Sequence, residues 1–532
     1  MSKLPIGIQT FRQIREEGFY YVDKTDYARR LVDDDGKHYF LSRPRRFGKS
    51  LFVDTLKELF EGNAALFRGL AIHDGWNWSK RHPVVRLDFS GGNFRRSGEL
   101  HANAMRQLTA AQDRAAPGRF ARLMDALRGR RPSPFEDTTL SGRFATLLET
   151  LHRRSGRRVV VLVDEYDKPI LDAIDEPQLA ETNRDDLRGL YGTLKACDAH
   201  VELTFITGVS KFSKVSLFSD LNNLIDLTLD PAYAAVCGYT EADLNAVFAP
   251  ELPGLDRGEI RAWYNGYHWL GGEQDKVYNP FCLLKLFRTR LFRAHWFETA
   301  TPRFLIDTLL RRGFAAPDLE GVHASETLLS AFDVDFIAPE ALLFQTGYLT
   351  IAEVEEQPND YPRYRLGYPN REVRRGLNES LLDALAPTWR TTGNGAALRR
   401  VLAAEDWAGV EALLRALMAG IPHDWHRRND IARYEGYWVS VFYAWFQASM
   451  DGVVAEDATS RGRLDLAVRL GESAYLFEFK VAERSEPGAA LAQLQARGYA
   501  DKHRAASRSV HLIGVEISAE SRDITAFETA PG

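Results

Sequence analysis

The apolar run Val159–Val163 limits the fold of this 532-residue chain more than any other feature. Five consecutive apolar residues, mostly β-branched, are typical of a strand that is buried on both faces. His38–Leu41, Val84–Phe89 and Val201–Ile206 are further short strand candidates, and amphipathic helices alternate with them. This alternation predicts a parallel α/β sheet in the N-terminal part of the chain.

The pattern changes twice further along the chain. From Tyr239 to Arg312 it is mainly helical, and strands and turns mix from Ala338 to Asn370. From Val453 the period shifts to two residues, as in strands, and a helix follows Gly488. A chain of this length needs more than one core. We therefore predict an α/β multidomain fold with a sheet domain at 1–235, a helical and winged-helix-like region at 236–395, and a second α/β domain at 396–532.

The net charge of the chain limits how it could contact nucleic acid. The formal net charge of −5 argues against a protein whose whole surface is basic, so any contact with nucleic acid must rest on local clusters of Lys and Arg. Arg153–Arg158 and Arg128–Arg131 are two such clusters, although each is also typical of a solvated helix end or loop.

Cysteine content and the start of the chain indicate the compartment. Cys197, Cys237 and Cys282 are widely separated, which fits neither a disulfide framework nor a zinc site. The first residues lack the apolar core of a signal peptide, and no apolar stretch approaches the ~20 residues that span a bilayer. We predict a cytoplasmic protein without a membrane segment.

A phosphate-binding signal lies between the first strand candidate and the helix that follows it. Gly48, Lys49 and Ser50 match the end of the phosphate-binding loop pattern, in which the Lys reaches the outer phosphates and the hydroxyl holds Mg²⁺. The first Gly of that pattern falls at Arg43, so the full motif is not matched.

Two acidic residues at the end of the apolar run complete the pattern. Asp164 is expected to hold Mg²⁺ near the nucleotide phosphates, and Glu165 to polarise an attacking water. A plainer interpretation is that both carboxylates only cap the next helix. At the end of the neighbouring strand candidate, either Ser210 or Lys211 is expected to sense the terminal phosphate.

A second centre of chemistry lies near the C-terminus. Strands Arg463–Leu470 and Ala474–Val481 form a hairpin whose turn, if centred on Gly471-Glu472, places Asp465 opposite Glu478. Facing carboxylates repel unless a cation lies between them, so we predict a divalent metal there, and Lys480 shares their face. The plainer interpretation is the wet face of a sheet.

The chain resembles the AAA-ATPase-like family of proteins that carry a C-terminal nuclease domain. The resemblance rests on motifs along nearly the whole chain: Tyr21–Thr25, Arg43–Ser50, Val163–Pro169, Phe218–Leu224, Trp263–Tyr267, Val277–Pro280, Gln345–Thr350 and Tyr368–Val373. In this family the loop begins with Arg-Pro-Arg-Arg, so the departure at Arg43 looks like a family trait. Arg45 and Arg46 are then expected to neutralise phosphate charge.

The hairpin and its surroundings resemble the PD-(D/E)XK nuclease superfamily. By that resemblance Asp465 and Glu478 are metal ligands, Lys480 is the catalytic lysine, and Gln493 is a supporting polar residue. Glu435 and Glu456 match further acidic positions, which either add a ligand or cap and solvate their elements.

These patterns together predict an ATP-binding protein and ATPase coupled to a Mg²⁺- or Mn²⁺-dependent nuclease that acts on DNA. The alternative is an NTP-switched scaffold whose nuclease-like domain binds nucleic acid or a protein without cutting. Three points stay open at this stage: DNA against RNA as substrate, hydrolysis against binding of ATP, and whether the chain forms homo-oligomers.

Overall fold

The computed structural model describes residues 2–115, 139–211, 217–218, 221, 223–297, 305–306, 309, 319, 321–330, 338–357, 361–386, 389, 391–421, 435–459 and 462–532. The chain divides into two compact units. The first comprises Met1–Trp296 and His323–Arg365, and the second comprises Phe297–Val322 and Leu366–Gly532. The predicted region 236–395 contributes to both units, and its boundaries stay a prediction.

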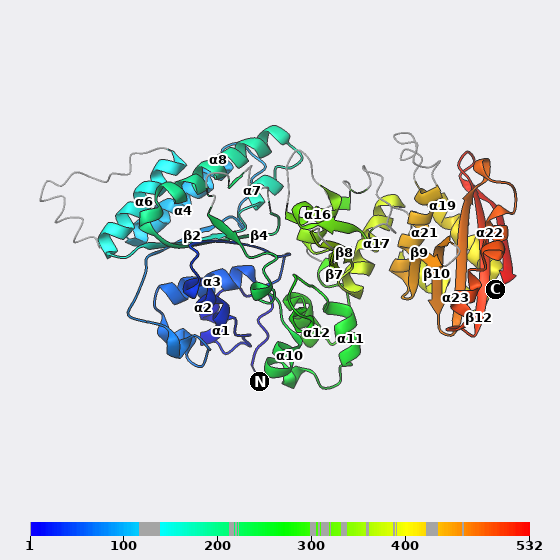
Figure 1. Cartoon of the computed structure of the whole chain (residues 1–532), viewed down its shortest axis with the longest axis horizontal. Coiled ribbons are helices and arrows are strands. Elements are labelled where there is room, and N and C mark those ends of the chain that lie inside the picture. The colour runs from blue at the N-terminus through cyan, green and yellow to red at the C-terminus, as the bar shows by residue number, and fades with distance from the viewer. Residues whose placement is uncertain are drawn as a thin grey trace, which may run out of the picture. The chain divides into compact units, whose positions relative to one another are not determined.

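A five-stranded parallel sheet forms the centre of the first unit (Figure 1). Its strand order is β2-β3-β4-β1-β5, and all neighbouring strands run parallel. The strands are β1 (His38–Ser42), β2 (Val84–Asp88), β3 (Val159–Asp164), β4 (Val201–Gly208) and β5 (Leu224–Asp226). The predicted parallel sheet is confirmed, and β4 separates β1 from β3, so the ends of these three strands lie next to one another at one edge.

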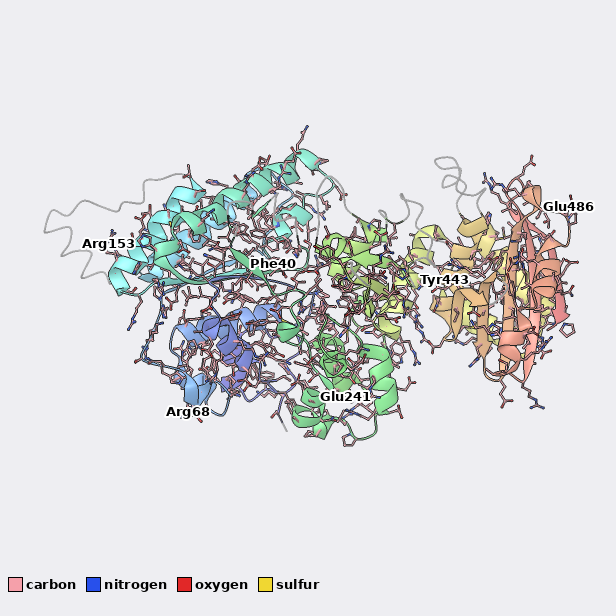
Figure 2. The ribbon with its side chains drawn as sticks, in the orientation of Figure 1. Phe40, Arg68, Arg153, Glu241, Tyr443 and Glu486 are labelled. Carbon is pink, nitrogen blue, oxygen red and sulfur yellow. The ribbon has the colours of Figure 1, made fainter. Side chains whose placement is uncertain are left out.

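Helices cover both faces of this sheet. Figure 1 shows α4, α6 and α8 along one side and α1, α2 and α3 along the other. Helix α3 buries Phe52, Leu56 and Leu59, whose spacing of three to four residues puts them on one helix face. Phe40, at the centre of β1, is 1% exposed and lies among densely packed side chains (Figure 2). The helices are α1 (Phe11–Glu16), α2 (Thr25–Asp33), α3 (Lys49–Phe60), α4 (Glu99–Ala115), α6 (Leu140–Ser155), α7 (Lys168–Leu171) and α8 (Pro177–Ala196).

The remainder of the first unit is mainly helical, as predicted for this stretch. Asn279 caps the start of α12, because its side chain accepts the backbone N–H groups of Phe281 and Cys282. A small sheet has the strand order β6-β8-β7. The elements are α10 (Glu241–Val247), α11 (Arg257–Tyr264), α12 (Pro280–Thr289), β6 (His323–Ser325), α15 (Glu326–Ser330), α16 (Pro339–Thr346), β7 (Thr350–Glu355) and β8 (Arg363–Gly367).

A mixed five-stranded sheet forms the core of the second unit. Its order is β13-β12-β11-β10-β9, and only β11 and β12 run parallel among the described pairs. The elements are α17 (Arg371–Leu385), α18 (Thr391–Ala403), α19 (Trp407–Ala419), α21 (Glu435–Ser449), β9 (Val453–Thr459), β10 (Gly462–Leu470), β11 (Ser473–Val481), α22 (Ala489–Arg497), α23 (Ala500–Arg504), β12 (Ser509–Ser518) and β13 (Asp523–Pro531). The predicted C-terminal α/β domain is confirmed. Across the described part of the chain, every helix is too short or too polar to cross a bilayer.

Candidate functional site

The loop between β1 and α3 carries the predicted phosphate-binding residues. Gly48 has a φ of 98°, a left-handed conformation that favours glycine, and a Cβ added there would meet no heavy atom within 4 Å. The requirement for glycine is therefore conformational rather than steric. Lys49 is 5% exposed, and its ammonium donates to the carbonyl oxygens of Arg43 and Pro44, at 2.9 and 3.0 Å. Lys49 thus lies folded against its own loop, at the N-terminus of α3.

Arg43, which takes the place of the usual first Gly, points into the protein. Its guanidinium donates to the carbonyl oxygens of Ser42 and Thr228, both at 2.9 Å, and of Tyr233 at 3.1 Å. The same group lies 4.2 Å from the ring centroid of Trp269. Burial lowers the pKa of Arg43 to about 10. Arg43 therefore anchors the loop to neighbouring segments, and this anchoring explains why a long side chain stands where a Gly is expected.

Arg45 and Arg46 are both exposed, unlike Arg43. Arg46 has a φ of 68°, and its guanidinium lies 4.9 Å from the ring centroid of Phe281. The charge of Arg45 is near enough to Glu165 to lower the pKa of that carboxyl, against the larger effect of burial, which raises it. Two cationic side chains thus stand at the surface of the loop, one of them near the predicted acidic pair.

The predicted acidic pair lies beside the loop. Asp164 is fully buried, and neither of its carboxylate oxygens has a hydrogen-bond partner among the described residues. Burial raises the pKa of its carboxyl, while the nearby Ser50 hydroxyl and the charge of Lys49 oppose the shift. Glu165 follows in a left-handed conformation with a φ of 51°. Its pKa is also raised by burial and lowered by Lys49. Lys49, Ser50, Asp164 and Glu165 therefore lie together, and a hydroxyl beside a carboxylate is a donor set that suits Mg²⁺.

Ser210 and Lys211, the two sensor candidates, are both engaged within the protein. The Ser210 hydroxyl and N–H donate to Asp167 Oδ2 at 2.6 and 2.7 Å. The Lys211 ammonium pairs with Asp226, and its backbone N–H donates to Gln345 Oε1 at 2.8 Å. Both residues follow β4, which lies between β1, the strand before the loop, and β3, the strand that ends at the acidic pair. They therefore lie beside the carboxyl ends of these strands.

Asp167 is a structural residue of this site that the sequence patterns did not single out. Its Oδ2 also accepts the N–H of Val209 at 3.0 Å, so one carboxylate oxygen holds the end of β4 through three donors. A Cβ on Gly208 would lie 2.4 Å from Asp167 Oδ1, so glycine is needed for this close approach. The only sequence signal for this contact is Gly208 at the end of β4, and that signal has meaning only once β3 and β4 are known to pair.

The hairpin of the second unit has the predicted register. Its described pairs run from Leu466 with Phe477 to Leu470 with Ser473, around the turn at Gly471-Glu472. Beyond Leu466 the Asp465 side chain contacts β11, because Asp465 Oδ2 accepts the backbone N–H of Phe479 at 2.8 Å. The Asp465 carboxylate is therefore held against the segment that carries Glu478.

Glu478, Lys480 and Gln493 meet at one carboxylate oxygen. Lys480 Nζ lies 3.2 Å from Glu478 Oε1, and the Gln493 amide donates to the same oxygen. Glu478 is 1% exposed. Gln493 reaches it from α22, whose backbone passes close to β12. A Cβ on Gly514 would lie 2.5 Å from the backbone nitrogen of Leu491, so this approach requires glycine.

The face of β11 opposite this polar cluster packs on α21. Phe479 stacks on Phe442 with ring centroids 5.0 Å apart, and Phe477 lies 5.2 Å from Phe446, so both rings pack on α21. The predicted alternation along β11 is thereby confirmed. Glu435 begins α21 and Glu456 lies within β9, but their side chains lie outside the described parts of the structure.

The described donors at the hairpin are two carboxylates, Asp465 and Glu478. Carboxylate oxygens are preferred ligands of Mg²⁺ and Mn²⁺, and water commonly completes the shell. Within the described residues no group of three or more His, Cys, Asp or Glu side chains is arranged to hold a metal ion. Glu516 is a further acidic residue that the sequence patterns missed: it is 4% exposed and is the ladder partner of Lys480.

The predicted basic clusters contribute little that bears on a partner. Arg158 forms an ion pair of 2.7 Å with Glu202, which supports the plainer interpretation for that residue. Arg153 lies at the C-terminal end of α6, where a cationic side chain is favoured by the helix dipole (Figure 2). The cluster Arg128–Arg131 lies outside the described residues.

The fold and the two candidate sites define a class of protein that joins an AAA-ATPase-like α/β unit to a nuclease-like unit. Residues 5–218 match the family model described as a predicted AAA-ATPase, and residues 433–527 match that of the PD-(D/E)XK nuclease superfamily. A protein of Azotobacter chroococcum mcd 1, described as an uncharacterized protein in the vnfD 5' region, is 53% identical over 539 residues, which cover 99% of this chain and 98% of that relative. The chain belongs to the family of AAA-ATPase-like proteins with a C-terminal PD-(D/E)XK nuclease superfamily domain, and the resemblance seen in the sequence is confirmed.

Proposed function

We propose that the first unit binds and hydrolyses ATP with Mg²⁺. Lys49 would contact the outer phosphates, Ser50 and Asp164 would hold Mg²⁺, and Glu165 would polarise the attacking water. Arg45 and Arg46 would neutralise phosphate charge from the exposed side of the loop. Ser210, whose hydroxyl donates to Asp167, would respond to the terminal phosphate, and this response would shift the segment after β4. The proximity of Lys49 and Ser50 to Asp164 supports this assignment.

We propose that the second unit is a metal-dependent nuclease that cleaves phosphodiester bonds in DNA. Asp465 and Glu478 would hold Mg²⁺ or Mn²⁺, with Glu435 as a further ligand, and the bound ion supplies charge stabilisation and an acidic water. Lys480 would orient that water and stabilise developing negative charge. Gln493 would hold the Glu478 carboxylate in place. The observation that carries the proposal is the meeting of Lys480 and Gln493 at Glu478 Oε1.

Nuclease activity is tested with the purified full chain. Linear, circular and single-stranded DNA and RNA are incubated with Mg²⁺, Mn²⁺ or EDTA, with and without ATP, and products are separated on gels. We expect cleavage with either metal and none in EDTA. Asp465→Ala, Glu478→Ala and Lys480→Ala should each abolish cleavage. Glu472→Ala removes an exposed carboxylate from the turn of the same hairpin and should cut like the wild type.

Metal binding is measured separately, by thermal unfolding with and without Mg²⁺ or Mn²⁺. A ligand that binds only the folded state stabilises it, by about 2.7 kcal/mol at a concentration of 100 Kd. Asp465→Ala and Glu478→Ala should lose this stabilisation, whereas Lys480→Ala should keep most of it. Cleavage by Asp465→Ala at the wild-type rate would refute the assignment. A wild type that neither cuts nor gains stability from metal would favour the non-cutting scaffold.

A further inference from the structure

Arg86, on β2, connects three acidic residues around the candidate Mg²⁺ site. Its Nη1 lies 3.0 Å from Asp54 Oδ1, and its Nη2 lies 3.0 Å from Asp88 Oδ2 and 3.6 Å from Asp164 Oδ2. Asp88 and Asp164 are ladder partners on neighbouring strands. Like charges directly opposite each other in a sheet repel, so the guanidinium nitrogen near both carboxylates offsets that repulsion.

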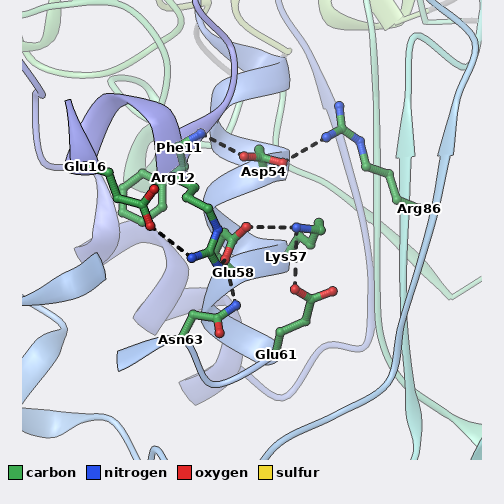
Figure 3. A network of polar contacts seen from close by, with 9 residues as sticks. All are labelled: Phe11, Arg12, Glu16, Asp54, Lys57, Glu58, Glu61, Asn63 and Arg86. Carbon is green, nitrogen blue, oxygen red and sulfur yellow. Dashed lines mark hydrogen bonds and ion pairs between the residues drawn. The ribbon is translucent and has the colours of Figure 1, made fainter. Parts of the chain in front are cut away.

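Asp54 directs the Arg86 side chain. It is 5% exposed, and its second oxygen, Oδ2, accepts the backbone N–H of Phe11 at 2.7 Å (Figure 3). Both carboxylate oxygens are therefore engaged. A guanidinium is a rigid planar fork, so holding Nη1 on Asp54 also determines where Nη2 points. Nη2 points toward the strand ends that carry Asp88, at 3.0 Å, and Asp164, at 3.6 Å.

Asp54 and Ser50 lie four residues apart on α3, which places them on the same face of the helix. The Ser50 hydroxyl lies near Asp164, and Asp54 is connected to Asp164 through Arg86. The helix whose first turn carries Lys49 therefore brings two side chains, Ser50 and Asp54, to the surroundings of the Asp164 carboxylate. Helix α1 is joined to the same helix by the ion pair of Arg12 with Glu58, and Glu58 also pairs with Lys57 within α3 (Figure 3).

We propose that Asp54 and Arg86 are positioning residues for Mg²⁺ in the nucleotide site: together they orient the Asp164 carboxylate toward Ser50. This inference rests on the proposed ATP site. It predicts that substitution of either residue reduces the gain in ATP affinity that Mg²⁺ provides, and leaves the affinity measured without Mg²⁺ unchanged. If the pair were purely structural, substitution would lower both affinities together or neither.

The test measures ATP affinity of the full chain by calorimetry, in saturating Mg²⁺ and in EDTA, and takes the ratio of the two Kd values. Asp54→Asn keeps an oxygen that can accept the Phe11 N–H but loses the charge that holds Arg86. We expect it to reduce the Mg²⁺-dependent gain in affinity at least fivefold and to leave the Kd in EDTA unchanged. Arg86→Lys keeps a positive charge without the fork and should show a reduction of the same kind.

Glu58→Gln is the matched control, because Glu58 is also buried on α3 and belongs to the ion-pair network with α1, but is not paired with Arg86. It should keep the wild-type ratio. Circular dichroism and gel filtration identify any variant that fails to fold, and Arg86→Lys then carries the test because it retains the charge. A wild-type ratio in Asp54→Asn and Arg86→Lys would overturn the inference. Absence of ATP binding by the wild type in both conditions would instead refute the proposed ATP site.

Discussion

Removing the Lys49 ammonium tests the ATP site most directly. In the structure this group donates to two loop carbonyl oxygens, at 2.9 and 3.0 Å. Hydrogen bonds to charged groups each contribute about 1.5–3 kcal/mol net. Phosphate binding must share or replace these bonds, so the net gain from Lys49 is smaller than the strength of its new contact. We therefore expect Lys49→Ala to weaken ATP binding at least tenfold, or about 1.4 kcal/mol, rather than to abolish it outright.

The assay is calorimetric titration of the full chain with ATP, supported by steady-state turnover. Lys57→Ala is the control: Lys57 lies on the same helix, its side chain is 30% exposed, and it pairs with Glu58 and Glu61. It should bind ATP like the wild type. Glu165→Gln should keep the affinity and lose turnover, because it changes the water-polarising group and retains Asp164. An unchanged Kd in Lys49→Ala would refute the assignment of the loop.

Two further predictions concern the stability of the first unit. Arg43→Gly restores the usual first residue of the loop but removes the hydrogen bonds to Thr228 and Tyr233, so it should lower the free energy of unfolding, measured by urea denaturation, by about 3 kcal/mol. Arg45→Gly, at an exposed position, should change this free energy little, and equal urea midpoints for the two variants would contradict the anchoring role of Arg43. Burial lowers the pKa of His38 in the folded protein. As the pH falls through about 6.5, the ordinary pKa of histidine, the unfolded chain therefore binds a proton at His38 before the folded protein does. The free energy of unfolding decreases over that range of pH. His38→Gln should make this fall shallower in unfolding curves at several pH values, and an unchanged slope would show that His38 does not contribute.

The sequence predicts those parts of the fold that depend on local pattern. The run Val159–Val163 forms a buried strand because an unbroken apolar segment fits only between two covered faces. The hairpin register follows from the turn at Gly471-Glu472, and the alternation along β11 puts Phe479 on α21. In each case the residues that decide the structure lie within a few positions of one another.

Long-range contacts explain what the sequence does not predict. Arg43 has the same chemistry as Arg45, and its inward direction depends on distant partners, among them the carbonyl oxygens of Thr228 and Tyr233. Ser210 has a strand-end position typical of a phosphate sensor, but its hydroxyl donates to Asp167. No local pattern states which distant acceptor a polar side chain will reach.

The hairpin site can be predicted from local sequence pattern more completely than the candidate nucleotide site, and this difference has a physical origin. At the hairpin, Asp465, Glu478, Lys480 and Gln493 come from one strand pair and the next helix, so a turn and a period of two bring most of the set together. The candidate nucleotide site is assembled where the ends of parallel strands meet, and parallel neighbours need long crossover connections. Its supporting residues accordingly come from distant segments, as Arg86 on β2 and Gln345 on α16 illustrate. Because the strands are parallel, local sequence patterns do not reveal which side chains lie around Asp164. These side chains can be identified only when the strand order is known.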